Sequence, residues 1–127
     1  MPATIFLIDD DQDDIDILKE AIAEIEPRAL CMGYIYPEEA IRLMTGTEML
    51  ISPDYIFIDI NMPVITGDKC LKMIRAEKRF DNIMIIMYST SMPDGVADNL
   101  KKAGANYVFE KPVRLDGYFS VLREILK

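Results

Sequence analysis

The chain has 127 residues, half of them hydrophobic, which is the usual length of one domain and enough apolar material for a buried core. Its 14 basic and 22 acidic residues give a formal net charge of −8, which excludes direct nucleic-acid binding through a basic surface. The sequence contains no histidine, which also excludes Ser-His-Asp and Cys-His catalysis, imidazole metal sites and a phosphohistidine of the chain's own.

Neither a secretion signal nor a membrane span is predicted. Residues 1–4 form no basic region, and no apolar run approaches the roughly 18 residues of a membrane helix. Cys31 and Cys70 lack a close pair spacing, and each lies in an apolar pattern that suits a small buried side chain. We therefore expect a cytoplasmic protein with no membrane partner.

Short apolar runs alternate with amphipathic segments along the whole chain. The first half predicts a strand at 4–8, a helix at 13–25, a strand at 29–35 and a helix from 37 toward 46, with an extra loop or helical extension within 45–53. The second half predicts strands at 55–58, 83–87 and 106–109, helices at 67–80 and 115–126, and a weaker helix at 93–103.

This alternation predicts an α/β fold, a single doubly wound (βα)5 domain. Parallel strands need crossover connections, which are usually helical, so the helices are expected to cover both faces of a five-stranded parallel sheet. The strands are continuous apolar runs, as burial on both faces requires. In open sheets of this kind, ligands bind beyond the carboxyl ends of the strands, near the point where the strand order reverses.

Reactive side chains follow four of the five predicted strands. Asp9 and Asp10 follow the first strand, Asp59 the third, Ser89 the fourth and Lys111 the fifth. In a strand order of 2-1-3-4-5 the first and third strands are neighbours, so three carboxylates would share one pocket with a hydroxyl and an ammonium group nearby. Oxygen ligands without imidazole suit Mg²⁺, which commonly works with phosphate. The pattern therefore indicates phosphoryl transfer.

In this order and placement, these residues resemble the receiver domain of two-component response regulators. The resemblance covers essentially the whole chain and includes the acidic pair after the first strand, the segment DINMPVITG at 59–67, Ser89, and Lys111 followed by Pro112. It implies a flavodoxin-like, CheY-like fold with strand order 2-1-3-4-5. It also implies one receiver domain over residues 1–127 with no output domain.

The resemblance assigns the phosphoacceptor and the metal ligands. Asp59 would accept the phosphoryl group. Asp10 and Asp59 would bind Mg²⁺ directly together with the backbone carbonyl of Asn61, and Asp9 would contribute through water. An aspartate carboxylate is a reasonable nucleophile toward phosphorus when a metal and a lysine stabilise the charge on the phosphoryl oxygens.

The same resemblance assigns the remaining site residues. Lys111 would pair with the phosphoryl group, Ser89 would donate a hydrogen bond to it, and the bond between Lys111 and Pro112 would be cis.

Two positions depart from the family pattern. Val108 stands where an aromatic residue usually changes rotamer on activation, and Ser89 stands where threonine is commoner, so its rotamer is less restricted.

The resemblance also implies the partners. Because the chain has no histidine, its phosphoryl group would come from a sensor histidine kinase, a histidine phosphotransfer protein or a small phosphodonor. The domain would catalyse only its own phosphorylation and dephosphorylation, so we do not expect an enzyme. Phosphorylation would change its affinity for an unknown downstream protein, with the chain acting as a monomer or as a phosphorylation-dependent dimer.

Other acids near the first strand are expected to be solvated. Asp11, Asp13, Asp14 and Asp16 fall at the start of the first predicted helix, where the helix dipole favours negative charge. On this interpretation they take no part in the site.

Two other functions are consistent with parts of the sequence. A phosphohydrolase of the haloacid-dehalogenase type would use Asp9 as nucleophile and Asp11 as acid and base, but such sites usually carry a further acidic motif late in the chain, where this sequence has EKPVR. A flavin carrier on the flavodoxin-like topology would need Ser, Thr and Gly in the first loop to bind a phosphate, and the six acids there would repel one.

Overall fold

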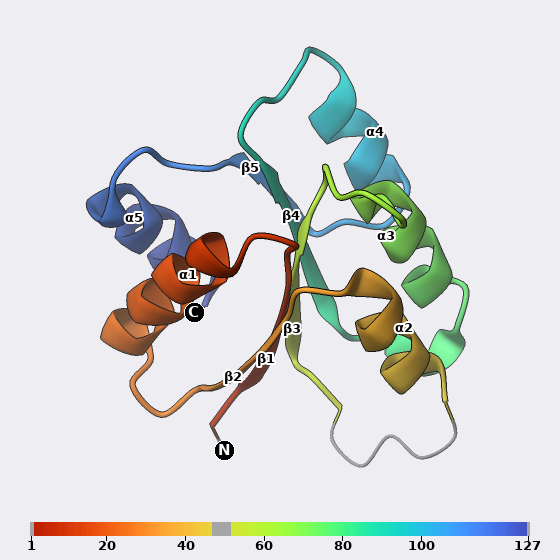
Figure 1. Ribbon diagram of the computed structural model, residues 1–127, viewed down its shortest axis with the longest axis horizontal. Coiled ribbons are helices and arrows are strands. Elements are labelled where there is room, and N and C mark those ends of the chain that lie inside the picture. The colour runs from red at the N-terminus through yellow and green to blue at the C-terminus, as the bar shows by residue number, and fades with distance from the viewer. Residues whose placement is uncertain (1, 47–51, 127) are drawn as a thin grey trace.

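The computed structural model describes residues 2–46 and 52–126, which form five strands, five α-helices and one 3₁₀ turn (Figure 1). In chain order these are β1 (Thr4–Ile8), α1 (Gln12–Ile25), β2 (Leu30–Tyr34), α2 (Pro37–Thr45), β3 (Tyr55–Asp59), α3 (Gly67–Arg75), η1 (Lys78–Phe80), β4 (Met84–Ser89), α4 (Val96–Lys102), β5 (Tyr107–Glu110) and α5 (Leu115–Ile125). The predicted alternation of strands and helices is confirmed. Of the extra segment expected within 45–53, residues 47–51 lie outside the described residues.

The strands form one parallel sheet in the order β2-β1-β3-β4-β5, as predicted. Helices α1 and α5 cover one face, and α2, α3 and α4 cover the other (Figure 1). Because all five strands run in the same direction, their carboxyl ends meet at one edge. The order reverses between the central neighbours β1 and β3, so this edge is where a ligand site is expected.

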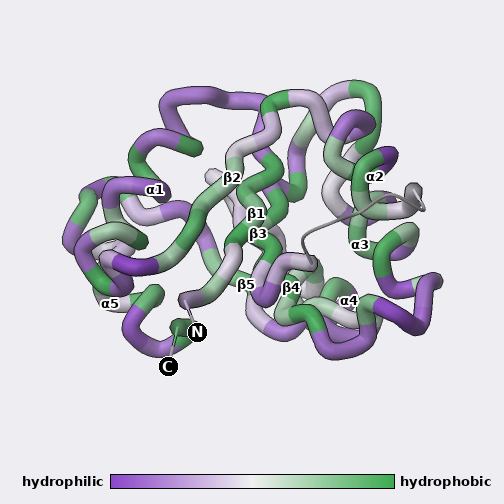
Figure 2. The backbone as a smooth tube through the Cα atoms, turned by 90° about the horizontal axis from the view of Figure 1, so that it is seen from below, coloured by the Kyte–Doolittle hydropathy of each residue, from purple (hydrophilic) through white to green (hydrophobic). Residues whose placement is uncertain are grey.

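Alternating side chains of the central strands fill a core on each face of the sheet. Phe6, Ile58 and Met87 pack under α2, α3 and α4, whereas Leu7 and Phe57 pack under α1 and α5. Figure 2 shows the largely hydrophobic strands between the two groups of helices. β2 and β5 form the edges of the sheet and are less buried than the three central strands.

Two helices are shorter than their sequence patterns predict. The predicted helix at 67–80 ends at Arg75, and the segment continues as η1 because Glu77 has an extended backbone. α4 starts at Val96 because Gly95, with φ of 86°, has a left-handed conformation outside the helix. In the part of the chain that the structure describes, no helix is both long and apolar enough to cross a membrane.

The bond between Lys111 and Pro112 is trans, and no cis peptide bond occurs within residues 2–46 and 52–126. The expectation of a cis bond is therefore wrong. It came from the family resemblance alone, whereas an X–Pro bond favours the trans form by roughly 0.5–1 kcal/mol unless its surroundings oppose this.

Candidate functional site

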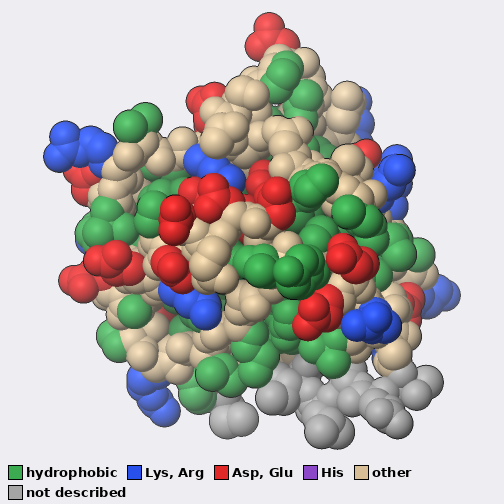
Figure 3. Space-filling view, viewed as in Figure 1, with side chains coloured by type: hydrophobic (Ala, Val, Ile, Leu, Met, Phe, Trp, Pro, Cys, Tyr) green, Lys and Arg blue, Asp and Glu red, His purple; other side chains and the backbone are tan. Residues whose placement is uncertain are grey.

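Three carboxylates converge at the carboxyl ends of β1 and β3. One oxygen each from Asp9, Asp10 and Asp59 lies within 4.8 Å of the others. Asp9 is fully buried and Asp59 is 5% exposed, whereas Asp10 is open to solvent. Figure 3 shows acidic side chains gathered near the middle of the face that is turned to the viewer, beside a basic side chain. The closeness of these acids, predicted from the strand order, is confirmed.

This group of acids fits a hard divalent cation such as Mg²⁺. All the donors are carboxylate oxygens, and no imidazole or thiolate lies among them. A solvent-facing member, Asp10, leaves room for the water ligands that Mg²⁺ usually keeps. Two unit charges about 4 Å apart repel by about 4 kcal/mol at an effective dielectric of 20, which a bound cation would offset.

Asn61 connects the acidic group to the end of β4. Its backbone N–H donates to Asp59 Oδ1 at 3.2 Å, and its side-chain Nδ2 donates to Ser89 Oγ at 2.7 Å. Ser89 is 1% exposed, and its backbone carbonyl accepts from the N–H of Lys111 at 2.7 Å. The Ser89 hydroxyl is therefore linked to Asp59 through Asn61, which lies two residues after the end of β3.

Lys111 provides the positive charge of the site. Its Nζ lies 2.7 Å from Asp14 Oδ2, 3.3 Å from Asp9 Oδ2 and 3.5 Å from Asp59 Oδ2. Burial lowers the pKa of Lys111, but the hydrogen bond to Asp14 and the charges of Asp9 and Asp59 outweigh it and raise the pKa above its ordinary value. The lysine is therefore a permanent cation, as a group that neutralises phosphoryl oxygens requires.

Asp14 belongs to the site, which the sequence analysis missed. Its side chain is 25% exposed and makes the shortest of the Lys111 ion pairs, so it is not a freely solvated acid. A signal was present, since Asp14 lies four residues before the buried Leu18 and is therefore its neighbour on the same side of α1. Asp11 does act as expected of an acid at a helix start, because its side chain accepts from the N–H of Asp13 at 2.9 Å and caps α1.

Asp59 is less acidic than an ordinary aspartate. Burial and the neighbouring charge of Asp9 raise its pKa from 3.8 to about 6, although Lys111 and the N–H of Asn61 act in the opposite direction. A bound divalent cation would lower this pKa, since a nearby positive charge favours the carboxylate form. The ionised, nucleophilic form of Asp59 is thus favoured when the site holds a cation.

Tyr88 is a second site residue that the sequence analysis missed. It is fully buried next to Ser89, and its hydroxyl donates to Asp9 Oδ2 at 2.6 Å. Burial and the charge of Asp9 raise its pKa well above the ordinary value, so the hydroxyl stays protonated. In the sequence Tyr88 continues the apolar run of β4. An ordinary aromatic residue of the core has the same pattern, so the sequence does not distinguish the two.

Val108 stands where the family usually has an aromatic residue, and Tyr107 and Phe109 flank it in the sequence. Val108 packs toward the core under α2, α3 and α4. Phe109 faces the other side, where its ring stacks on Tyr88 with centroids 5.6 Å apart and meets Tyr118 edge to face. Aromatic contacts therefore run from Tyr88 at the site to Tyr118 of α5 through Phe109, which is adjacent to position 108.

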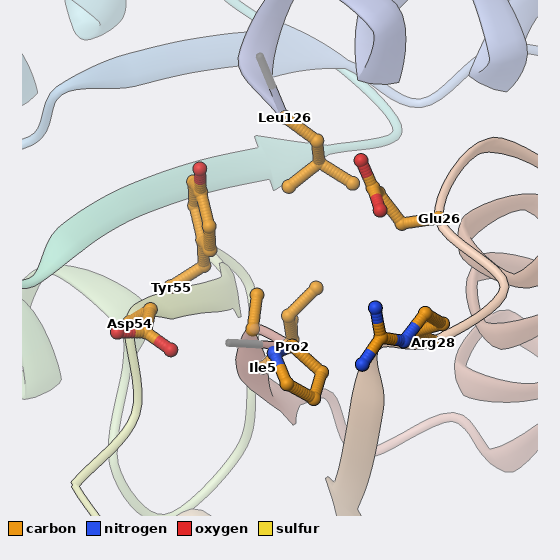
Figure 4. A pocket seen from close by; sticks show the side chains of 8 residues that line it. Pro2, Ile5, Glu26, Arg28, Asp54, Tyr55 and Leu126 are labelled. Carbon is orange, nitrogen blue, oxygen red and sulfur yellow. The ribbon is translucent and has the colours of Figure 1, made fainter.

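The described surface has a hollow beside the site and another at the opposite edge of the sheet. One, of about 460 Å³, lies beside the acidic group and is lined by Asp14, Thr90, Lys111 and Tyr118 among others. The other, of about 400 Å³, lies at the amino ends of the strands between Arg28, Tyr55 and neighbouring side chains (Figure 4). Of these two, the first adjoins the reactive residues.

The sequence is similar to known signalling proteins. The family model described as response regulator receiver domain matches residues 5–123. Stress response regulator protein 1 of Lodderomyces elongisporus is 28% identical over 123 residues, which cover 95% of this chain and 33% of that protein. The chain therefore spans about a third of the length of this curated relative.

The fold is shared with solved response regulators. The phosphorylated cyanobacterial phytochrome response regulator RcpA superposes with a TM-score of 0.86 at 24% identity, covering 98% of this chain and 91% of that one. The Mn²⁺-bound form of response regulator Rcp1 superposes with a TM-score of 0.83 at 20% identity, with the same coverage. At these identities the solved structures show a common fold.

Proposed function

We propose, from the premise that this chain belongs to the response regulator receiver domain family, that Asp59 is its phosphoacceptor. The family makes the chain a phosphoacceptor signalling domain rather than a conventional enzyme. The observation that supports Asp59 is its place among two further carboxylates, Lys111 and Ser89 at the carboxyl ends of the central strands. Asp59 is linked to Lys111 at 3.5 Å and, through Asn61, to the Ser89 hydroxyl.

The site would hold Mg²⁺ through Asp10, Asp59 and the backbone carbonyl of Asn61, with Asp9 contributing through water. The three-carboxylate cluster supports this, and Rcp1, which shares the fold, is described bound to Mn²⁺. When bound, the cation supplies positive charge to the phosphoryl oxygens and lowers the pKa of the nucleophile.

In the proposed reaction, an Asp59 carboxylate oxygen attacks the phosphorus of the donor. A new O–P bond forms, and the bond from phosphorus to the donor nitrogen or oxygen breaks, with its electron pair leaving on the donor. Lys111 pairs with the developing negative charge, which requires it to give up part of its contact with Asp14. Ser89 turns its hydroxyl from Asn61 toward a phosphoryl oxygen and donates to it.

We further propose that the donor is a histidine kinase or a histidine phosphotransfer protein. The sequence has no histidine of its own, and the hollow beside Asp14 and Lys111 offers access for a donor side chain. Phosphorylation of Asp59 adds about 1.5 to 2 negative charges at the end of β3, near Ser89 and Lys111 at the ends of β4 and β5, which would change the affinity for a downstream protein.

The phosphohydrolase alternative is not favoured. It needs Asp11 as a free acid and base beside Asp9, but Asp11 is engaged as the N-cap of α1, where its carboxylate accepts from a backbone N–H. Asp9 in turn is fully buried and is bonded to Tyr88 and to the N–H of Asp11. This environment suits a fixed ligand better than a nucleophile.

Incubation with acetyl phosphate and Mg²⁺, followed by intact mass measurement, tests the proposal. The unaltered protein should gain one phosphoryl group, and Asp59→Asn should gain none. Asp94→Asn, which changes an exposed acid that does not belong to the three-carboxylate group, is the matched control and should be labelled like the unaltered protein. Equal labelling of Asp59→Asn would remove Asp59 from its role, and a phosphoryl group mapped to Asp9 of the unaltered protein, with multiple turnover of the phosphodonor, would favour the hydrolase.

A further inference from the structure

Tyr88 is a buried polar side chain that contacts a carboxylate of the acidic site from the core side. The two residues are 79 positions apart, yet the Tyr88 hydroxyl and Asp9 Oδ2 are 2.6 Å apart and both side chains are fully buried. Hydrogen bonds to ionised groups are roughly twice as strong as neutral ones, and a fully buried bond does not exchange with water. This contact therefore restrains Asp9 strongly.

The Asp9 carboxylate is held at both of its oxygens. Oδ1 accepts from the N–H of Asp11 at 3.0 Å, while Oδ2 accepts from Tyr88. A carboxylate fixed at both oxygens cannot rotate about its χ2 bond without losing one of the two contacts. Oδ2 also lies 3.3 Å from Lys111 Nζ, but carboxylate oxygens carry about four lone-pair sites in all, so the restraint leaves Asp9 able to accept from a metal-bound water as well.

The ring of Tyr88 is fixed as firmly as its hydroxyl. Phe109 stacks on it with an interplanar angle of 19°, and Phe57 meets it edge to face. Lys111 Nζ lies 4.9 Å from the ring centroid, within the range of a cation–π contact. The same side chain therefore contacts both a carboxylate and the ammonium group of the proposed phosphorylation site.

We propose that Tyr88 is a positioning residue for the divalent cation, which it serves by orienting the Asp9 carboxylate through its hydroxyl and by seating the Lys111 ammonium group against its ring. This inference rests on the proposed function, since it takes Asp9 as part of the cation site. Groups that orient a metal ligand typically change metal affinity by about 10- to 100-fold when they are removed.

Tyr88→Phe isolates the hydroxyl, because it leaves the ring and its contact with Lys111 in place. Free Mn²⁺ is measured by electron paramagnetic resonance while the metal-free protein is titrated. Tyr88→Phe should raise the dissociation constant about 10-fold, whereas the control Tyr118→Phe, which removes another hydroxyl from the same aromatic stack, should stay within about twofold. An affinity of Tyr88→Phe equal to that of the unaltered protein would overturn the inference.

A double-mutant cycle separates positioning from a general structural effect. If Tyr88 acts through Asp9, Tyr88→Phe should change Mn²⁺ affinity by no more than about twofold in an Asp9→Asn background. The same 10-fold loss in both backgrounds would overturn the inference. Absence of Mn²⁺ binding by the unaltered protein would overturn both this inference and the metal site of the proposed function, whereas binding with no effect at position 88 overturns only the inference.

A second measurement needs no change at position 88, should Tyr88→Phe fail to fold. The six tyrosines are labelled with 3-fluorotyrosine and followed by ¹⁹F NMR. Asp9→Asn should move one resonance most strongly, and saturation of the unaltered protein with Mg²⁺ should move that same resonance. If the two changes move different resonances, Tyr88 does not report on the Asp9 site and the inference is wrong.

Discussion

At the scale of single residues, the site brings negative charges together and neutralises them only in part with positive charge. Asp9 and Asp59 are both buried, and Lys111 is the nearest cation to each of them. Lys111 is shared with Asp14, so one positive charge faces three carboxylates. The excess negative charge makes the site ready to bind a cation and makes the metal-free protein less stable than a neutralised one.

Asp59 should make the metal-free protein less stable as the pH rises. Its folded pKa of about 6 lies above its ordinary value of 3.8, so between these values the folded state binds more protons than the unfolded state. The free energy of unfolding therefore falls between about pH 4 and pH 6, by at most about 3 kcal/mol, since one pKa unit corresponds to about 1.36 kcal/mol.

Urea unfolding in EDTA across this range measures the effect. Asp59→Asn should lose this part of the pH dependence and should be more stable than the unaltered protein at pH 7, while Asp94→Asn should retain the unaltered profile. Parallel profiles for Asp59→Asn and the unaltered protein would contradict the raised pKa of Asp59.

At the scale of elements, the connection from β3 to α3 brings two backbones into contact beneath the site. A Cβ atom built on Gly67 would lie 2.4 Å from the carbonyl oxygen of Asp59, and the Gly67 N–H donates to Ile60 O at 2.9 Å. The start of α3 therefore rests directly on the backbone that carries Asp59, and only a residue without a side chain permits this approach.

Gly67→Ala should push α3 away from the end of β3. We expect a loss of about 3 kcal/mol in the free energy of unfolding, because a backbone atom rather than a flexible side chain meets the new methyl group, and a loss of Mn²⁺ affinity as Asp59 moves. Gly95→Ala is the contrast, since it costs only about 1 kcal/mol through its left-handed φ of 86° and no atom lies within 4 Å of the new methyl group. Unchanged Mn²⁺ affinity in folded Gly67→Ala would show that this contact does not position Asp59.

At the scale of the whole molecule, the site joins elements that are distant in the chain. The acids come from the ends of β1 and β3, Lys111 follows β5, and Asp14 lies on α1. A cation bound to the carboxylates would therefore link the two central strands and relieve their mutual repulsion in the folded state alone. The unfolded chain cannot hold these groups together, so cation binding is coupled to folding.

Mg²⁺ should thus stabilise the entire domain. At a free concentration ten times its dissociation constant, the expected gain is about 1.4 kcal/mol in the free energy of unfolding. Urea unfolding with MgCl₂, compared with NaCl at equal ionic strength to remove general screening of the net charge of −8, measures it. Asp10→Asn should lose most of the gain, and an equal gain in that variant would show that Mg²⁺ acts elsewhere.

The sequence by itself determined the strand and helix pattern, the parallel sheet and the acidic group at its edge. Continuous apolar runs and helical periodicity are local signals, and a reactive residue directly after a strand is carried to the same edge as its counterparts in every parallel sheet. This is why the strand-end positions of Asp9, Asp59, Ser89 and Lys111 could be predicted from the sequence alone.

Only the tertiary structure decided which side chains touch these four. Asp14 reaches Lys111 across 97 residues and Tyr88 reaches Asp9 across 79, through packing of α1 and β4 against the strand ends. A solvated helix acid and a core aromatic residue have the same local patterns as these two. The direction of a hydroxyl or carboxylate depends on which distant groups surround it, and that information exists only after the chain has folded.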